Sequence, residues 1–185
     1  MSNSSIRPKL LNNEFYFLRF ISSSPDETRS LGEEISRFVL PGSFFLLYGD
    51  LGSGKTEFTR GFARGCGWTD VRSPSFTIVN EYPASPPIIH ADLYRVDEVS
   101  SSEFALEEYL RDGCVVLVEW AGRIDIQSIA DAWEARFYYQ DGLPGEMKMN
   151  ENIRVIDIAC RGERSCESMR RLKEESELIR TNQGN

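Results

Sequence analysis

A glycine-rich stretch between two apolar segments constrains this chain more than any other feature. Residues 48–62 read YGDLGSGKTEFTRGF, and the part from Gly49 to Thr56 matches the pattern G-x-x-x-x-G-K-[ST]. The apolar run SFFLLY (43–48) precedes the stretch, and apolar residues at helical spacing follow it. Glycine has no Cβ, so backbone N–H groups there can turn inward around a phosphate. The order of strand, glycine-rich loop and helix therefore predicts a phosphate-binding P-loop.

The positions of this loop have distinct expected roles. Lys55 is expected to reach the β- and γ-phosphates of a nucleotide, and the Thr56 hydroxyl to bind Mg²⁺. The chain contains no Asn-Lys-x-Asp, the element with which many GTPases read guanine, so the sequence favours ATP. The residues predicted to bind the nucleotide are Gly49, Asp50, Leu51, Gly52, Ser53, Gly54, Lys55 and Thr56.

A P-loop protein also needs a carboxylate at the end of a neighbouring buried strand, where it holds Mg²⁺ or orients the attacking water. Glu119 directly follows the apolar run CVVLV, and Asp92 directly follows IIHA. We predict that both acids and Lys55 are catalytic, and that Glu119 joins Thr56 as a metal ligand. Which acid positions the water is left open.

Two further features lie next to these acids in the sequence. His90 is the only histidine of the chain, and we interpret it as a structural residue rather than as a base. The polar segment RSPSFT (72–77) is either a switch near the γ-phosphate or a plain loop.

Hydrophobic patterning predicts an α/β fold. Short, wholly apolar segments such as 43–48 are typical of parallel strands buried on both faces of a sheet, and antiparallel strands are expected near the C-terminal end. Ser24 and Glu27 are spaced as a capping box, with Pro25 at the first helical position. The predicted strands are 13–22, 43–48, 75–82, 88–96, 114–120, 132–140 and 152–160, and the predicted helices are 25–39, 56–67 and 101–113.

The length of 185 residues is most simply one domain over residues 1–165, followed by a charged, helical or partly disordered tail over 166–185. No stretch approaches the roughly 20 apolar residues of a membrane span, and the N-terminus lacks the apolar segment of a secretory signal. These features predict a cytoplasmic protein with no membrane contact. The net charge of −8 argues against direct RNA binding, because Lys and Arg contacts to phosphates dominate that affinity.

The four cysteines are scattered along the chain and include no C-x-x-C pair. Free cysteines are among the most buried residue types, and Cys114 begins an apolar run, so we predict that it is a small core residue. Neither a zinc site nor a disulfide is predicted.

In chain order, these segments resemble the bacterial TsaE family (formerly YjeE), the ATPases of tRNA threonylcarbamoyladenosine biosynthesis. The likeness spans about residues 24–125 and rests on SPDET, GDLGSGKT, RSPSFTIVNEY, HADLYRV, LEEYL and LVEWAGR. It implies a P-loop NTPase-like, three-layer α/β/α fold with a mixed, mainly parallel central sheet. Ala105 departs from the pattern, because relatives usually have glycine there, and we expect local repacking at that point.

The resemblance also implies roles for residues and partners. Asp92 is needed for ATP hydrolysis, Glu119 is the second metal-side group, residues 73–77 form a switch-like loop, and Trp120 lies beside the site. The family works with two other subunits, TsaB and TsaD, which modify adenosine 37 of tRNAs that read codons starting with A. The resemblance implies that this subunit meets tRNA only through them and drives or resets the complex by slow, partner-stimulated hydrolysis.

Two other readings of the P-loop stay open at this point. A small-molecule kinase shares the loop but usually adds an arginine-bearing lid. A nucleotide-dependent interaction switch shares it too and hydrolyses almost nothing, because P-loop switches can be very slow until a partner completes the site.

Overall fold

The computed structural model of the chain describes residues 7–8, 17–74, 78–96, 105–125, 129–139 and 153–183. Of the predicted strands and helices, residues 13–16, 75–77, 101–104, 140 and 152 therefore lie outside the described residues. The elements are β1 (Arg7–Pro8), β2 (Phe17–Ser22), α1 (Pro25–Ser36), β3 (Phe44–Gly49), α2 (Lys55–Gly65), β4 (Val79–Tyr82), β5 (Ile88–Asp92), α3 (Leu106–Arg111), β6 (Val115–Glu119), the 3₁₀ helix η2 (Ala121–Arg123), β7 (Ala132–Tyr139), β8 (Arg154–Arg161) and α4 (Glu163–Gln183).

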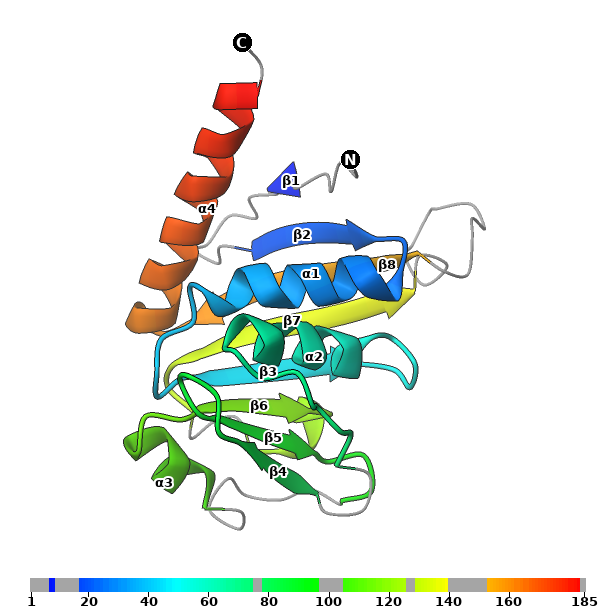
Figure 1. The fold of residues 1–185 in the computed structure, drawn as a ribbon, viewed down its shortest axis with the longest axis vertical. Coiled ribbons are helices and arrows are strands. Elements are labelled where there is room, and N and C mark those ends of the chain that lie inside the picture. The colour runs from blue at the N-terminus through cyan, green and yellow to red at the C-terminus, as the bar shows by residue number, and fades with distance from the viewer. Residues whose placement is uncertain are drawn as a thin grey trace.

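The strands form one eight-stranded sheet in the order β1-β2-β8-β7-β3-β6-β5-β4 (Figure 1). Strands β7, β3, β6 and β5 make a parallel centre, and the strands outside it pair antiparallel with their neighbours. Because β2 is antiparallel to β8 and β8 is antiparallel to β7, β2 also points with the centre. The predicted mixed, mainly parallel sheet is confirmed, and so are the antiparallel strands near the C-terminal end.

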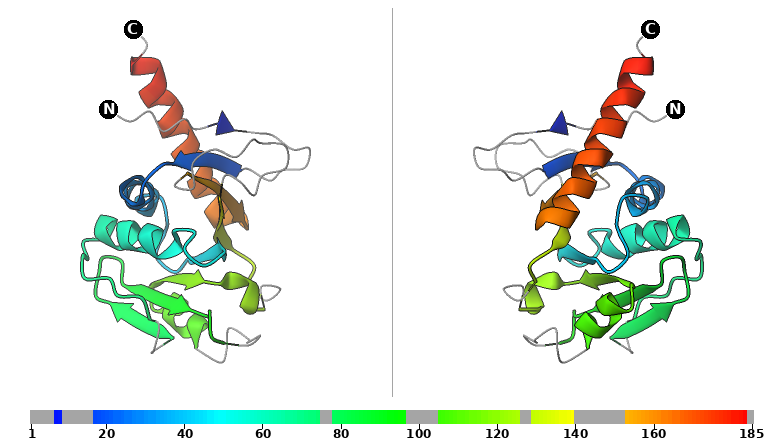
Figure 2. Two further views of the ribbon diagram at one scale, coloured as in Figure 1. Left: turned by 90° about the vertical axis from the view of Figure 1, so that its right-hand side faces the viewer. Right: turned by 90° about the vertical axis from the view of Figure 1, so that its left-hand side faces the viewer.

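Helices cover the sheet on both faces and give the predicted three layers (Figure 2). On one face α1 and α2 lie side by side, and their residues Ile35 and Phe62 join the start of α4 in one hydrophobic core. On the other face Leu106 of α3 and Ala121 of η2 belong to a second core over β3, β6 and β5. The P-loop and its helix α2 are therefore held between a buried strand and a packed partner helix.

The packing of α1 against α2 is unusually close. A Cβ added at Gly61 of α2 would lie 1.8 Å from the backbone oxygen of Arg29 in α1, so only glycine fits there. This close approach ties the position of α2 to that of α1.

The capping of α1 differs in one detail from the prediction. The Glu27 N–H donates to Ser24 Oγ at 3.2 Å as expected, but the Glu27 carboxylate accepts from the Ser23 N–H, at 2.7 Å. The helix ends at Ser36 rather than at the predicted Val39, because its last turn closes with bonds to the residue three positions back.

The start of α3 shows why glycine would suit position 105. Ala105 caps α3 with a φ of 51°, in the left-handed region that glycine adopts at little cost. Glycine is therefore the residue that the backbone favours at this turn, and alanine accepts some strain there.

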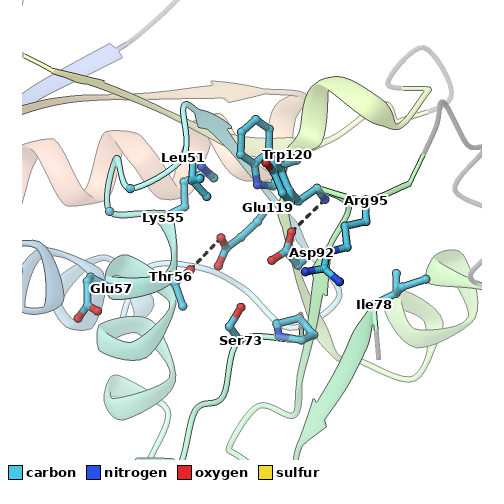
Figure 3. Close-up of a pocket in the computed structure, with 14 residues that line it drawn as sticks. Leu51, Lys55, Thr56, Glu57, Ser73, Ile78, Asp92, Arg95, Glu119 and Trp120 are labelled. Atoms are coloured by element: carbon cyan, nitrogen blue, oxygen red, sulfur yellow. Dashed lines mark hydrogen bonds between the residues drawn. The ribbon is translucent and has the colours of Figure 1, made fainter. Parts of the chain in front are cut away.

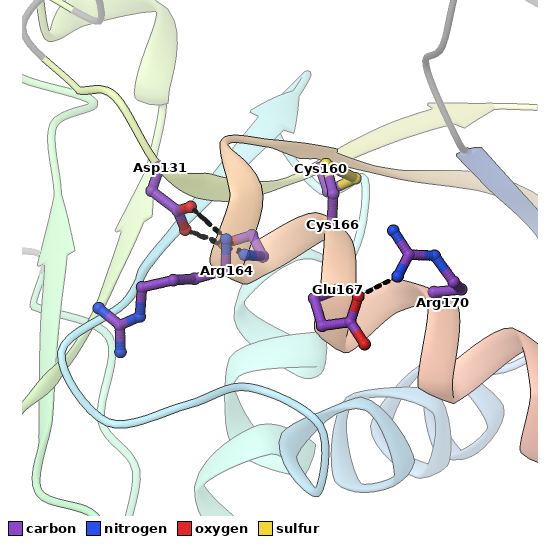
Figure 4. The surroundings of a disulfide bond; sticks show 7 residues. Asp131, Cys160, Arg164, Cys166, Glu167 and Arg170 are labelled. Carbon is purple, nitrogen blue, oxygen red and sulfur yellow. Dashed lines mark hydrogen bonds and ion pairs between the residues drawn. A yellow bond between two sulfur atoms is a disulfide. The ribbon is translucent and has the colours of Figure 1, made fainter.

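The prediction that the chain has no disulfide is wrong, because Cys160 at the end of β8 is bonded to Cys166 in α4 (Figure 4). Gly162 turns the chain between the two elements with a φ of 81°, and the two Cα atoms come within 5.1 Å. The sequence spacing of six residues hides this proximity because the turn, rather than a regular element, creates it. Cys66 and Cys114 are free and buried, which confirms the core assignment of Cys114.

The charged C-terminal segment is helical, and its first turns pack on the core. Met169 and Leu172 of α4 are buried, and Asp131 accepts hydrogen bonds from the Arg164 and Ser165 N–H groups at the start of the helix. Within the described part of the chain, no helix is long and apolar enough to cross a membrane.

Candidate nucleotide-binding site

A cavity of about 660 Å³ opens where β3, β5 and β6 end, the edge at which open α/β sheets bind their ligands. The P-loop and the start of α2 form one wall, and the segments that follow β5 and β6 form the other (Figure 3). The side chains of Lys55, Thr56, Asp92 and Glu119 all line this cavity. The structure thus brings four predicted site residues from three separate segments to one place.

The P-loop presents the start of α2 to the cavity. Gly54, the residue before the helix, has a φ of 108° and makes no side-chain capping bond. The first N–H groups of α2 therefore donate to no capping side chain, and they form the positive end of the helix dipole. This is the arrangement that binds phosphate in P-loop proteins.

Lys55 is held inside the loop. Its Nζ donates to the carbonyl oxygens of Gly49 and Asp50, both at 2.8 Å, and lies 4.3 Å from the ring centre of Trp120. Burial lowers the pKa of Lys55, while the negative charges of Glu119 and Asp92 oppose that shift. The Lys55 ammonium group is therefore hydrogen-bonded to backbone carbonyl groups of the loop. A phosphate bound in the loop would compete with these carbonyl groups for it.

Thr56 and Glu119 meet directly. The Thr56 hydroxyl donates to Glu119 Oε2 at 3.0 Å, and the other oxygen, Oε1, lies 2.9 Å from His90 Nε2. Glu119 is only 2% exposed. Asp92 stands opposite it in the register of β5 and β6 and is half-buried.

Trp120 follows Glu119 in a left-handed backbone conformation with a φ of 60°, which bulky residues rarely adopt. Its ring lies over the Lys55 ammonium and beside the ring of Tyr94, with a centroid distance of 4.9 Å. The turn after β6 therefore places an aromatic wall next to Lys55.

Not every predicted nucleotide-binding residue lines the cavity. Leu51, Gly52, Gly54, Lys55 and Thr56 do. Gly49 and Asp50 hold the Lys55 ammonium with their carbonyl groups, and Ser53 is buried next to it. Of the segment 72–77, Ser73 and Pro74 line the cavity, and 75–77 lie outside the described residues.

The structure adds residues that the sequence reasoning missed. Tyr94 and Arg95 line the cavity because β5 ends at Asp92 instead of continuing to residue 96. Asp92 Oδ1 accepts the Tyr94 N–H at 3.0 Å, a turn typical of Asp, and this bond directs the next residues toward the site. Tyr139 was missed as well: its hydroxyl donates to the P-loop carbonyl of Leu51 at 2.8 Å.

The donor set fits a nucleotide with Mg²⁺. The Thr56 hydroxyl and the Glu119 carboxylate are hard oxygen ligands already in contact with each other. Mg²⁺ is commonly bound by one or two protein oxygens, with substrate phosphates and waters as the other ligands. The uncapped start of α2 and the Lys55 ammonium beside it suit the phosphates.

Comparison with known proteins decides the family. The family model described as "Threonylcarbamoyl adenosine biosynthesis protein TsaE" matches residues 22–143. This chain belongs to the TsaE family.

Individual TsaE relatives agree with this assignment. The TsaE protein of Bacillus subtilis is 43% identical over 112 residues, which cover 60% of this chain and 70% of that protein. The TsaE protein of Haemophilus influenzae is 34% identical over 145 residues, covering 76% of this chain and 88% of the other. A crystal structure of Bacillus subtilis YdiB superposes with a TM-score of 0.72 at 30% identity and covers 89% of this chain and 99% of that one.

The region that matches the TsaE model contains the whole candidate site. It runs from the end of β2 past the end of β7 and includes the P-loop, Asp92, Glu119 and Trp120. Strand β8, helix α4 and the Cys160–Cys166 disulfide lie beyond it. The fold of this TsaE chain is that of a P-loop nucleotide-binding protein.

Proposed function

We propose that this chain is the ATPase subunit of the machinery that makes threonylcarbamoyladenosine in tRNA, and that it binds and hydrolyses ATP with Mg²⁺ in the cavity. Membership of the TsaE family assigns it to tRNA threonylcarbamoyladenosine biosynthesis. The observation that carries the ATPase part is the 3.0 Å hydrogen bond between Thr56 and Glu119. It joins the P-loop hydroxyl to a strand-end carboxylate, the pair that P-loop NTPases use to hold Mg²⁺.

Each side chain of the site has a part in this proposal. Lys55 and the start of α2 bind the phosphates and offset their negative charge. Mg²⁺, when bound by Thr56 and Glu119, neutralises charge on the phosphate oxygens.

Asp92 is the acid that we assign to the attacking water. Both oxygens of Glu119 are already engaged, by Thr56 and His90, whereas Asp92 is half-buried and lines the cavity. The water oxygen bonds to the γ-phosphorus as the bond from that phosphorus to the bridging oxygen breaks. ADP and inorganic phosphate leave, with one water proton on the phosphate and the other released to solvent.

The rim of the cavity supports partner-stimulated turnover. Among the described residues, the large apolar side chains that are exposed are Ile21, Leu51 and Tyr94, and the last two line this cavity at 67% and 43% exposed. Exposed apolar side chains beside a polar site are typical of a surface that a partner protein covers. We propose TsaB and TsaD as these partners, with tRNA reached through them because this chain carries a net charge of −8.

The small-molecule kinase is the weaker alternative. Its lid would need several arginines over the phosphates. Arg95 lines the cavity, but the arginine-rich segment of this chain begins at Arg161, opposite Ala132 at the start of β7. The P-loop instead follows Gly49, which pairs with Phe137 near the other end of β7. The C-terminal arginines thus begin at the opposite end of the strands from the cavity.

The products of ATP turnover test this proposal. The chain is incubated with ATP and Mg²⁺, alone, with the partner subunits and with added small-molecule acceptors, and ADP and inorganic phosphate are measured in each sample. A hydrolase releases both in equal amounts, and Lys55→Ala removes both. ADP without phosphate indicates transfer to an acceptor, and bound ATP with no products even in the presence of partners indicates a switch; either result would overturn the ATPase proposal.

A further inference from the structure

A buried histidine touches the metal side of the site. His90 lies in β5 and is 0% exposed. Its Nε2 is 2.9 Å from Glu119 Oε1, and its Nδ1 is 3.2 Å from the Tyr82 hydroxyl. Both ring nitrogens therefore have side-chain partners, one on each neighbouring strand.

These contacts belong to a longer chain of hydrogen bonds. At one end, Glu119 Oε2 accepts from the Thr56 hydroxyl at 3.0 Å. At the other end, the Tyr82 hydroxyl donates to the backbone oxygen of Arg72 at 2.7 Å, next to Ser73 in the cavity wall. The chain of bonds thus runs from the cavity at Thr56, past His90 on the sheet face that α2 covers, to Arg72, the residue before Ser73 of the cavity wall.

The donors and acceptors of this chain define what His90 does. A carboxylate oxygen accepts hydrogen bonds, so the form of His90 that carries a hydrogen on Nε2 is the one that can donate to Glu119. Glu119 is nearly fully buried, and a buried carboxylate is costly unless hydrogen bonds satisfy it. With Oε1 bound to His90, the other oxygen is directed at Thr56.

We propose that His90 is a positioning residue that holds the Glu119 carboxylate in the orientation needed for the metal beside Thr56. The inference rests on the proposed function, because it gives Glu119 a metal to bind. Residues behind a metal ligand commonly fix its orientation, and changing them costs about 10- to 100-fold in metal affinity or activity. The Tyr82 hydroxyl contacts Nδ1 on the far side of the His90 ring and also bonds to the backbone oxygen of Arg72.

Two amide substitutions separate positioning from a structural role. The amide nitrogen of His90→Gln takes roughly the place of Nε2 and keeps a donor for Glu119. In His90→Asn the amide takes roughly the place of Nδ1, so it can bond to Tyr82 but does not reach Glu119. Both variants are polar and similar in size, so a general effect on packing should be shared by the two.

The readout is the affinity for Mn²⁺ in the presence of a non-hydrolysable ATP analogue. Electron paramagnetic resonance measures the concentration of free Mn²⁺. Binding of the analogue without metal is measured separately. We expect His90→Asn to weaken Mn²⁺ binding by about 10- to 100-fold and His90→Gln to stay within about threefold of the unmodified chain. Analogue binding in EDTA should stay unchanged in both.

A control variant addresses stability. Ile88→Val lies on the same strand, is fully buried and loses one methyl group without touching the hydrogen-bond chain. It should lower the melting temperature and leave Mn²⁺ binding unchanged. If His90→Asn and His90→Gln bind Mn²⁺ equally well, or if Mn²⁺ affinity only follows melting temperature across the variants, His90 is a structural residue and the inference is overturned. An unmodified chain that binds neither the analogue nor Mn²⁺ would instead overturn the proposed function itself.

Discussion

Asp92 and Glu119 lie directly opposite each other at the ends of the neighbouring parallel strands β5 and β6. Glu119 is buried, with both oxygens in hydrogen bonds, whereas Asp92 is half-buried at the cavity. Two acids that are register partners thus have different surroundings. This difference underlies their separate roles in the proposed hydrolysis.

Substitution of the two acids should separate binding from turnover. We expect Asp92→Asn to keep ATP and Mg²⁺ binding and to lower turnover by about 100-fold or more, because it loses the group that orients the water. Glu119→Gln should weaken Mg²⁺ binding by at least the roughly tenfold typical of changes around a metal. Nucleotide binding by calorimetry and phosphate release check both. Full partner-stimulated turnover in Asp92→Asn would show that its assignment is wrong.

Lys55→Ala should weaken ATP binding by about 10- to 100-fold, the equivalent of one or more charge-assisted hydrogen bonds, and should stop hydrolysis. The matched control is Lys173→Ala, which removes a lysine from α4, away from the residues that line the cavity. Equilibrium binding of a fluorescent ATP analogue to the two variants measures the difference. Equal affinities would mean that Lys55 does not contact the phosphates.

Because α1 and α2 pack so closely, we expect two alanine substitutions to differ strongly in their effect on the free energy of unfolding. Gly61→Ala would put a Cβ 1.8 Å from the Arg29 carbonyl oxygen, so we expect a loss in the free energy of unfolding of about 1–3 kcal/mol or more. At Gly122 an added Cβ meets nothing within 4 Å, so Gly122→Ala should stay within about 0.5 kcal/mol of the unmodified chain. Urea unfolding of both variants checks this, and similar midpoints would contradict the close helix packing.

Thiol counting tests the disulfide. Burial raises the pKa of the Cys66 and Cys114 thiols, so little thiolate is present at neutral pH and both should react slowly in the native chain. After unfolding without reductant, Ellman's reagent should detect the two free cysteines, and after reduction all four. Four reactive thiols in the unfolded, unreduced chain would show that Cys160 and Cys166 are not bonded.

The site could be predicted from sequence where its chemistry is local. The P-loop is a continuous pattern, and Glu119 and Asp92 each end an apolar run, so all three could be recognised without knowing the sheet order. The shared cavity then follows from β3, β6 and β5 being neighbours in the sheet.

What sequence reasoning missed depends on contacts between distant segments. His90 reads as an ordinary core histidine until the register of β5 and β6 pairs it with Leu117, two residues before Glu119, which brings its Nε2 to the Glu119 carboxylate. Arg95 reads as part of a strand until the bond from the Tyr94 N–H to Asp92 ends β5. The disulfide depends on a tight turn at Gly162, which no periodic pattern indicates.

Steady-state ATP hydrolysis by the purified chain, alone and with TsaB and TsaD, tests the central claim most directly. Completing a P-loop site in trans can raise turnover by about 10³- to 10⁵-fold, so we predict slow release of phosphate by the chain alone and at least tenfold faster release with both partners. Asp92→Asn should remove the stimulated rate. A chain that binds ATP but releases phosphate at the same rate with and without the partners would contradict the account.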